Sequence, residues 1–173
     1  MVDILHEIEV LVPALRRYAR ALTRDIDRAD DLVQDCLERA VNHWSQRRDD
    51  NPRAWIFTIL HNLAITRLRS SASRPRHIAI DDAQEETFAR APSQEDGLRY
   101  RELLEAVARL PEDQKSVLLL ATVEGLSYAE TAGVLGVPIG TVMSRLSRAR
   151  ERLLKERDGD RGAQPVAQLR RVK

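Results

Sequence analysis

The part of this chain that most restricts its fold is Gly125–Leu154, which reads GLSYAETAGVLGVPIGTVMSRLSRARERLL. Ser127 and Glu130 have the spacing of a capping box, in which each side chain bonds the backbone of the other residue at the start of a helix. Gly136 can adopt the left-handed conformation of a tight turn, and Pro138 is tolerated at the start of a helix but not inside one. The stretch therefore predicts a short helix, a turn and a longer helix, the order of a helix-turn-helix.

The second helix of this motif, from about Ile139 to Leu154, has two unlike faces. One face is a narrow apolar stripe of Val142, Leu146, Ala149 and Leu153. The other side carries hydroxyl and guanidinium groups, which can contact phosphates and base edges in the major groove. We therefore predict a DNA-reading surface made by Thr141, Ser144, Arg145, Arg148 and Arg152. The alternative is an exposed helix whose charges serve only solubility.

The composition limits the other classes of function. The chain has 173 residues with a net charge of +1, so affinity for DNA must come from local clusters. The single cysteine, Cys36, excludes an internal disulfide and a cysteine-rich zinc site. No apolar run is long enough to span a membrane, and the first ten residues lack the basic start of a signal peptide. We expect a cytoplasmic protein with no metal and no cofactor.

Three segments before residue 70 have the apolar periodicity of amphipathic helices: 4–22, 27–44 and 52–69. In the second segment, Cys36 lies on the apolar face and is expected in the core. The opposite face carries Asp31, Gln34, Asp35 and Glu38, and Asp35 could pair with Arg39 one turn on. This acidic stripe is either a docking surface for a basic partner or an ordinary charged face, and the spacing alone does not decide between them.

Residues 44–52 lose helical periodicity and are predicted to form a loop. Trp55 lies on the apolar stripe of the helix that follows, so we expect it in the core. Polar residues of that helix lie away from the stripe and can contact bases, and arginines of the loop can hold phosphates. The candidates are Arg47, Arg48, Thr58, His61, Asn62 and Arg69. His61 has no neighbours at metal-ligand spacing, so a metal site is not predicted.

The predicted fold class is all-α, with two small helical domains at 1–69 and 97–155. Residues 70–96 are rich in serine, proline and charge and read as a flexible linker, either a solvated tether or an acidic segment that occupies a basic channel in a partner. Residues 156–173 read as a flexible tail. No Gly-rich phosphate loop, paired catalytic carboxylates or nucleophile motif is found, so no catalytic residue and no enzyme activity is predicted.

Three segments, in this order, resemble bacterial sigma factors of the extracytoplasmic-function class of the sigma-70 family. ADDLVQDCLERA (29–40) resembles the helix of region two that binds core polymerase. NPRAWIFTILHNLAITRLR (51–69) resembles the helix that reads the −10 element, and LSYAETAGVLGVPIGTVMSRLSRARERL (126–153) the recognition motif of region four. GTVMSRLSRARERL also resembles the alphaproteobacterial general-stress subgroup. Thr66 stands where the family often has Asp, and Met143 where it often has Lys.

The resemblance implies a promoter-specificity subunit that binds RNA polymerase core, recognises the −35 and −10 elements and starts promoter melting. It implies that Asp31, Gln34, Asp35 and Glu38 dock on the clamp helices of the largest polymerase subunit, and that the flap is a further contact. It also implies that the loop at 44–52 flips a base out of single-stranded −10 DNA, and that the linker threads toward the RNA path. An anti-sigma factor is the implied regulator.

Two other classes of protein explain part of the pattern. A sigma-like mimic that sequesters an anti-sigma factor without binding DNA would keep the fold but lose the basic recognition face, and here Arg145, Arg148 and Arg152 remain. Such a mimic usually also carries a receiver domain, for which this sequence has no residues. An ordinary repressor or activator would explain 125–154 but would leave 29–69 without a role.

Overall fold

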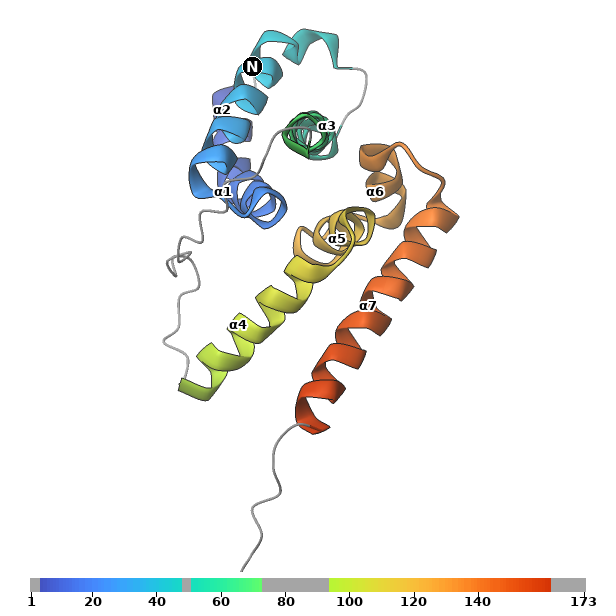
Figure 1. Cartoon of the computed structure of the whole chain (residues 1–173). Coiled ribbons are helices and arrows are strands. Elements are labelled where there is room, and N and C mark those ends of the chain that lie inside the picture. The colour runs from blue at the N-terminus through green and yellow to red at the C-terminus, as the bar shows by residue number, and fades with distance from the viewer. Residues whose placement is uncertain (1–3, 48–50, 73–93, 163–173) are drawn as a thin grey trace, which may run out of the picture.

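The computed structural model describes residues 4–47, 51–72 and 94–162, and the side chains of 4–47, 51–70 and 101–157. In these ranges the chain is helical, without a strand (Figure 1). The helices are α1 (Ile4–Thr23), α2 (Ile26–Asn42), α3 (Pro52–Ala72), α4 (Gln94–Arg109), α5 (Glu112–Leu118), α6 (Tyr128–Leu135) and α7 (Ile139–Gly162). A 3₁₀ turn (Trp44–Gln46) follows α2, and a π-helical turn (Leu119–Val123) follows α5. The predicted all-α fold is confirmed.

Helices α1, α2 and α3 pack around one apolar core. Leu15, Leu32 and Phe57 are completely buried in it, one from each helix. The ring of Tyr18 meets Phe57 edge to face, with 5.6 Å between centroids, an arrangement that adds about 1 kcal/mol to simple burial. Cys36 is buried as expected, with its Sγ 3.6 Å from the carbonyl oxygen of Ile56.

Helix α1 at Pro13 and helix α7 at its C-terminal end differ from the expectations. Helix α1 continues from Ile4 through Pro13, although we expected this proline to divide a frayed first turn from the main helix. Helix α7 extends to Gly162, so that its last turns lie in the stretch expected to be a frayed tail. Lys155 pairs with Glu151 at 2.8 Å, an i,i+4 contact that stabilises the helix where the tail was expected to begin.

The helix-turn-helix forms as its cap residues predict. The amide of Glu130 donates to the Ser127 hydroxyl at 3.2 Å, and the amide of Ser127 donates to the Glu130 carboxylate at 2.7 Å, which completes the capping box of α6. Gly136 ends α6 with φ of +63°, a conformation that glycine adopts without steric cost. Pro138 then precedes α7, whose residues Val142, Leu146 and Ala149 are buried against α5.

The two helical units are packed against each other. Helix α6 lies on α3 and α5 approaches α1, as Figure 1 shows near its centre. Leu119, Leu120, Leu126 and Val134 of the C-terminal unit belong to the same apolar cluster as the core of α1–α3. A linker-separated pair of domains was expected from the sequence, and their direct contact was not.

Candidate polymerase and promoter interfaces

The buried residues of α7 determine which face of the helix points to solvent. Ser144, Arg148 and Arg152 are exposed on it, and the Ser144 hydroxyl donates to the carbonyl of Thr141 at 3.1 Å. Thr141 is half-buried near the start of the helix. These predicted DNA-reading residues therefore share one face along the N-terminal part of α7.

Arg145 differs from the other predicted DNA-reading residues. Its Nε lies 3.2 Å from Oδ2 of Asp113 on α5, and its side chain is only 28% exposed. A base contact by Arg145 would have to replace this ion pair, whereas Arg148 is exposed. The pair instead ties the recognition helix to α5, which favours a positioning role.

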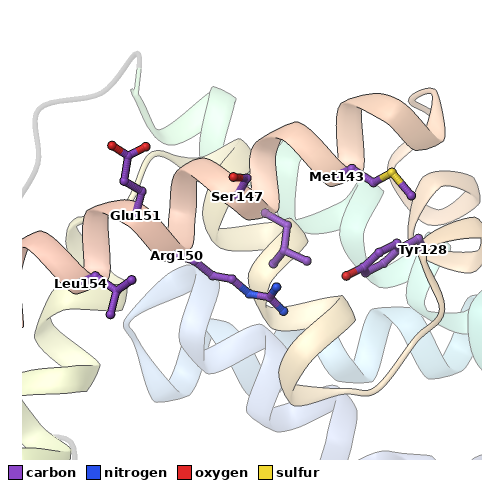
Figure 2. A pocket seen from close by; sticks show the side chains of 7 residues that line it. Tyr128, Met143, Ser147, Arg150, Glu151 and Leu154 are labelled. Atoms are coloured by element: carbon purple, nitrogen blue, oxygen red, sulfur yellow. The ribbon is translucent and has the colours of Figure 1, made fainter.

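A shallow hollow of about 410 Å³ lies beside this face of α7 (Figure 2). Arg150 of α7 and Tyr128 of α6 extend toward the middle of it, and Met143 lies at the end nearer Tyr128. Met143 is 50% exposed although it is apolar. Sequence reasoning did not nominate Tyr128 or Arg150, and the available signal was the apolar Met143 and Leu154 outside the core stripe.

The predicted acidic stripe is an open surface on α2. Asp31, Gln34 and Glu38 are exposed, and the amide of Gln34 donates to the Glu38 carboxylate at 3.3 Å. Asp35 is half-buried and pairs with Arg67 of α3. The partner suggested by the spacing was Arg39, but Arg67 reaches Asp35 across the helix pair.

The predicted −10 residues lie in different environments. Asn62 and Arg69 are exposed on α3, and Thr58 is half-buried with its hydroxyl bonded to the carbonyl of Ala54 at 2.9 Å. The guanidinium of Arg47 lies over the Trp44 ring, 4.6 Å from its centroid. Arg48 lies outside the described residues.

The prediction that His61 lies away from the core is wrong. The residue is 9% exposed, and its Nδ1 lies 2.9 Å from the buried hydroxyl of Tyr18. Burial lowers the pKa of His61 to about 4, so the ring is neutral at physiological pH. Helix α3 is covered by α1, α2 and α6, so its buried face is wider than the stripe read from its sequence.

A second hollow, of about 360 Å³, lies where the end of α2 meets α3. Its lining residues are Arg39, His43, Gln46, Trp55, Ile59 and Asn62. Trp55 stands edge to face with Trp44, 6.0 Å between centroids, so the aromatic wall of this hollow is held in place. Of these residues sequence reasoning nominated only Asn62, because Trp55 was assigned to the core and the end of α2 was not considered.

Glu124 joins the two helical units. Its side chain is 1% exposed, and its carboxylate accepts two hydrogen bonds from Arg17, at 2.9 Å from Nε and 2.7 Å from Nη2. Arg53 lies 3.9 Å from the same carboxylate and donates to the backbone carbonyl of Glu124. Asn51 donates to the carboxylate of Glu130 close by. Hydrogen bonding to Glu124 raises the pKa of Arg17.

Over the described residues, no group of His, Cys, Asp and Glu side chains is arranged to hold a metal ion. The described helices also include none that is long and apolar enough to cross a membrane.

Comparison with known proteins identifies the family. The model of the sigma2 domain of PhyR matches residues 8–61, and that of sigma-70 region 4 matches residues 100–153. EcfG of Rhodopseudomonas palustris, an extracytoplasmic-function sigma factor, is 39% identical over 85% of this chain and 81% of its own. The chain belongs to the extracytoplasmic-function sigma factors.

This sigma factor also resembles solved structures along most of its length. The sigma factor RpoE of Bartonella quintana, solved with the anti-sigma factor NepR, is 31% identical and matches with a TM-score of 0.72 over 92% of this chain and 99% of its own. The anti-anti-sigma factor PhyR of the same organism, also solved with NepR, shares the fold, at 18% identity and a TM-score of 0.57 over 89% of this chain and 50% of its own. Sigma factors act in transcription initiation and are not enzymes. Region 4 of these proteins binds DNA, so α6 and α7 form a DNA-binding helix-turn-helix.

Proposed function

We propose that this sigma factor binds RNA polymerase core through region 2, recognises a −35 and a −10 element, and starts promoter melting. The observation that carries the proposal is the outward face of α7, where Ser144 and Arg148 are exposed opposite the buried Val142, Leu146 and Ala149. A face of this kind can take guanine and phosphate in the major groove.

In the −35 complex, Ser144, Arg148 and Arg152 contact the duplex, together with Thr141 at the start of α7. Arg145 serves mainly to fix α7 against α5 through Asp113, and reaches DNA only if that ion pair opens. A bidentate contact from Arg148 to guanine would contribute about 1–3 kcal/mol of discrimination against the wrong base.

In the −10 complex, the hollow between α2 and α3 receives an unstacked base. Its aromatic wall at Trp55 and its polar groups at Arg39, His43 and Asn62 suit a base, which stacks on one face and bonds at its edge. Removing a base from the stack costs a few kcal/mol, so a fitted pocket and basic clamps are needed. We assign the clamps to Arg47, Arg48 and Arg69 and a nearby contact to Thr58, and we leave the buried His61 out.

The acidic stripe is the proposed contact with polymerase. Asp31, Gln34 and Glu38 are exposed for docking on the basic clamp helices of the largest subunit. Asp35 is partly neutralised by Arg67, so we place it at the edge of that contact. Region 4 would contact the flap. Domains at 1–69 and 97–155, joined by 70–96, and a cytoplasmic location belong to the same proposal, and the last turns of α7, to Gly162, are added to the second domain.

Regulation by an anti-sigma factor is part of the proposal, because the match with RpoE in its complex with NepR covers nearly the whole chain. The similarity to EcfG favours the general-stress subgroup. Titration of the purified chain with a NepR-type protein should give a 1:1 complex that no longer binds polymerase core.

Permanganate footprinting tests the promoter steps. Thymines near the −10 element should become reactive only when core polymerase and this chain are both present. Reactive thymines with core alone, or none with both on any promoter of a library, would contradict the proposal.

A sigma-like mimic is the second candidate, and one observation favours it: the matching model for region 2 is that of PhyR. A mimic would bind a NepR-type protein but would give no core binding and no permanganate-reactive thymines. The exposed Ser144, Arg148 and Arg152 on α7 favour the sigma factor, because a mimic has no use for a DNA-reading face.

A further inference from the structure

The second hollow, between the end of α2 and α3, has two unlike walls. On the α3 side, Trp55, Ile59 and Asn62 follow one another at spacings of four and three residues, so they share one face of the helix. This wall offers an aromatic ring and an apolar side chain, against which the flat face of a base can pack. The edge of that base must then bond the opposite wall.

The opposite wall is polar and follows the chain from α2 into the 3₁₀ turn. Arg39 lies in the last turn of α2, His43 directly follows the helix, and Gln46 ends the 3₁₀ turn. The rises of the two helix types place each of these residues roughly 6 Å beyond the one before it. A base edge that faces this wall therefore meets His43 at its middle.

The imidazole of His43 has a defined tautomer. Its Nδ1 lies 3.0 Å from the backbone carbonyl oxygen of Arg39. A carbonyl oxygen can only accept a hydrogen bond, so Nδ1 carries the proton and donates it. In the neutral ring Nε2 then has no proton and acts only as an acceptor. The middle of the polar wall thus accepts, whereas the Arg39 guanidinium only donates and the Gln46 amide can do either.

This order of groups is complementary to two of the four bases. Thymine and guanine carry a ring N–H at the middle of the Watson–Crick edge and a keto oxygen beside it, which suit Nε2 of His43 and the guanidinium of Arg39. Cytosine and adenine have an unprotonated ring nitrogen in place of that N–H. Two acceptors would then face each other, and each would lose a hydrogen bond that it makes in water.

We infer that His43 is a specificity-determining residue of this hollow, and that its Nε2 selects an unstacked thymine or guanine over cytosine and adenine. The inference rests on the function proposed above, because a base must leave the stack before it can enter the hollow. The tautomer of His43 rests only on its contact with Arg39.

The first test determines the tautomer in the full chain, without polymerase or DNA. Long-range proton–nitrogen correlation spectra of the histidine rings distinguish a proton on Nδ1 from one on Nε2, and the signals of His43 are assigned from their loss in His43→Gln. The neutral ring should carry its proton on Nδ1. A proton on Nε2 would overturn the inference, because no acceptor would then face the base.

The second test measures base selection with core polymerase, the full chain and a promoter library. The wild-type chain should enrich thymine or guanine at one −10 position of the transcribed templates. His43→Lys replaces the acceptor with a donor, so it should shift that position toward cytosine or adenine and leave the other positions unchanged. His6→Lys is the matched control, because His6 is exposed on α1 and does not line the hollow.

A substituted template gives the sharpest comparison. One recovered promoter is made with an unpaired −10 region, in which the selected base is either uracil or cytosine. These two bases have the same shape and differ only in the donors and acceptors of their edge. With the wild-type chain, cytosine should give at least about fivefold fewer transcripts than uracil, the lower end of what one matched base contact provides. His43→Lys should abolish or reverse this difference.

Equal transcription from uracil and cytosine with the wild-type chain would overturn the inference, even if His43→Lys proved inactive. The same base profile for His43→Lys and the wild-type chain would also overturn it while leaving the proposed function intact. An absence of chain-dependent transcripts with the wild-type chain would contradict the proposed function itself, and base selection by His43 with it.

Discussion

Arg17 and Glu124 are 107 residues apart in the chain, and the two nitrogens of the Arg17 guanidinium lie 2.9 and 2.7 Å from the two carboxylate oxygens of Glu124. The contact is bidentate, the geometry in which an arginine–carboxylate pair is strongest. It joins α1 of region 2 to the end of the π-helical turn of region 4. A specific ionic contact thus joins the two regions of this sigma factor.

Arg17→Ala should destabilise the chain more than Arg16→Ala does. The first substitution leaves the buried Glu124 with Arg53 alone, and discounting for the exposure of Arg17 the cost should be about 1–3 kcal/mol. Arg16 lies 3.6 Å from Asp30 in an exposed pair, so its loss should cost less than about 1 kcal/mol. Urea denaturation followed by circular dichroism compares the two, and equal losses would contradict the importance of the Glu124 contact.

Arg148→Ala and Arg145→Ala should have different effects on DNA binding. The first should weaken binding to one −35 base by about 1–3 kcal/mol and relax the preference at that position. Arg145→Ala should weaken all sequences alike and should lower stability as Asp113→Ala does, because the two residues form one ion pair. Fluorescence anisotropy with single-base variants of the −35 duplex measures both. A base-specific loss for Arg145→Ala would instead show that Arg145 contacts a base directly.

Met143→Lys should change the −35 preference without unfolding the domain. Met143 is exposed beside Ser144, at the end of the hollow near Tyr128, where an apolar side chain can contact the methyl group of thymine. Lysine would remove that contact and add a donor for phosphate or guanine. Transcription from a promoter library should then show reduced preference for thymine at one −35 position, and an identical base profile would contradict this role.

Asp31→Arg with Glu38→Arg should abolish binding to core polymerase while the helices remain folded. Both residues are exposed, so no internal contact of the core is lost. Asp35 is kept, because its substitution would also break the pair with Arg67. A pull-down with purified core gives the result, with Glu105→Arg as a surface control. Retained binding by the double variant would remove the acidic stripe from the proposed interface.

Stability should fall on acidification because of His61. Its folded-state pKa, about 4, lies below the ordinary value, so the unfolded chain binds the proton first. The stabilisation from a neutral His61 is complete above about pH 6.5 and is lost as the pH falls toward 4. At pH 5 the loss in the free energy of unfolding is about 2 kcal/mol. Urea denaturation at pH 7.5 and pH 5 should show a smaller loss for His61→Gln than for the exposed His43→Gln. Equal losses of stability for the two variants would contradict His61 as the origin of the acid sensitivity.

Local signals account for most of the fold. The helices follow from apolar periodicity, and the ends of α6 follow from Ser127, Glu130 and Gly136, because caps and turns involve residues only a few positions apart. The open faces of α2 and α7 follow for the same reason. The family resemblance then gave these faces their expected partners.

Contacts between elements could not be read in this way. Asp35 pairs with Arg67 and not with Arg39, Arg145 pairs with Asp113, and His61 is buried beside Tyr18. Each of these depends on how helices distant in sequence cross, which periodicity within one helix does not contain. The Glu124 contact is the extreme case, since it depends on how two whole domains meet.

Run-off transcription decides whether this chain directs initiation at specific promoters. Purified core polymerase is incubated with a promoter library, with and without this chain, and the transcripts are sequenced. We expect transcripts that depend on the chain and start downstream of one −35 and one −10 sequence, with the −35 preference altered by Arg148→Ala. Transcripts independent of the chain, or none from an active core with a folded chain, would contradict it.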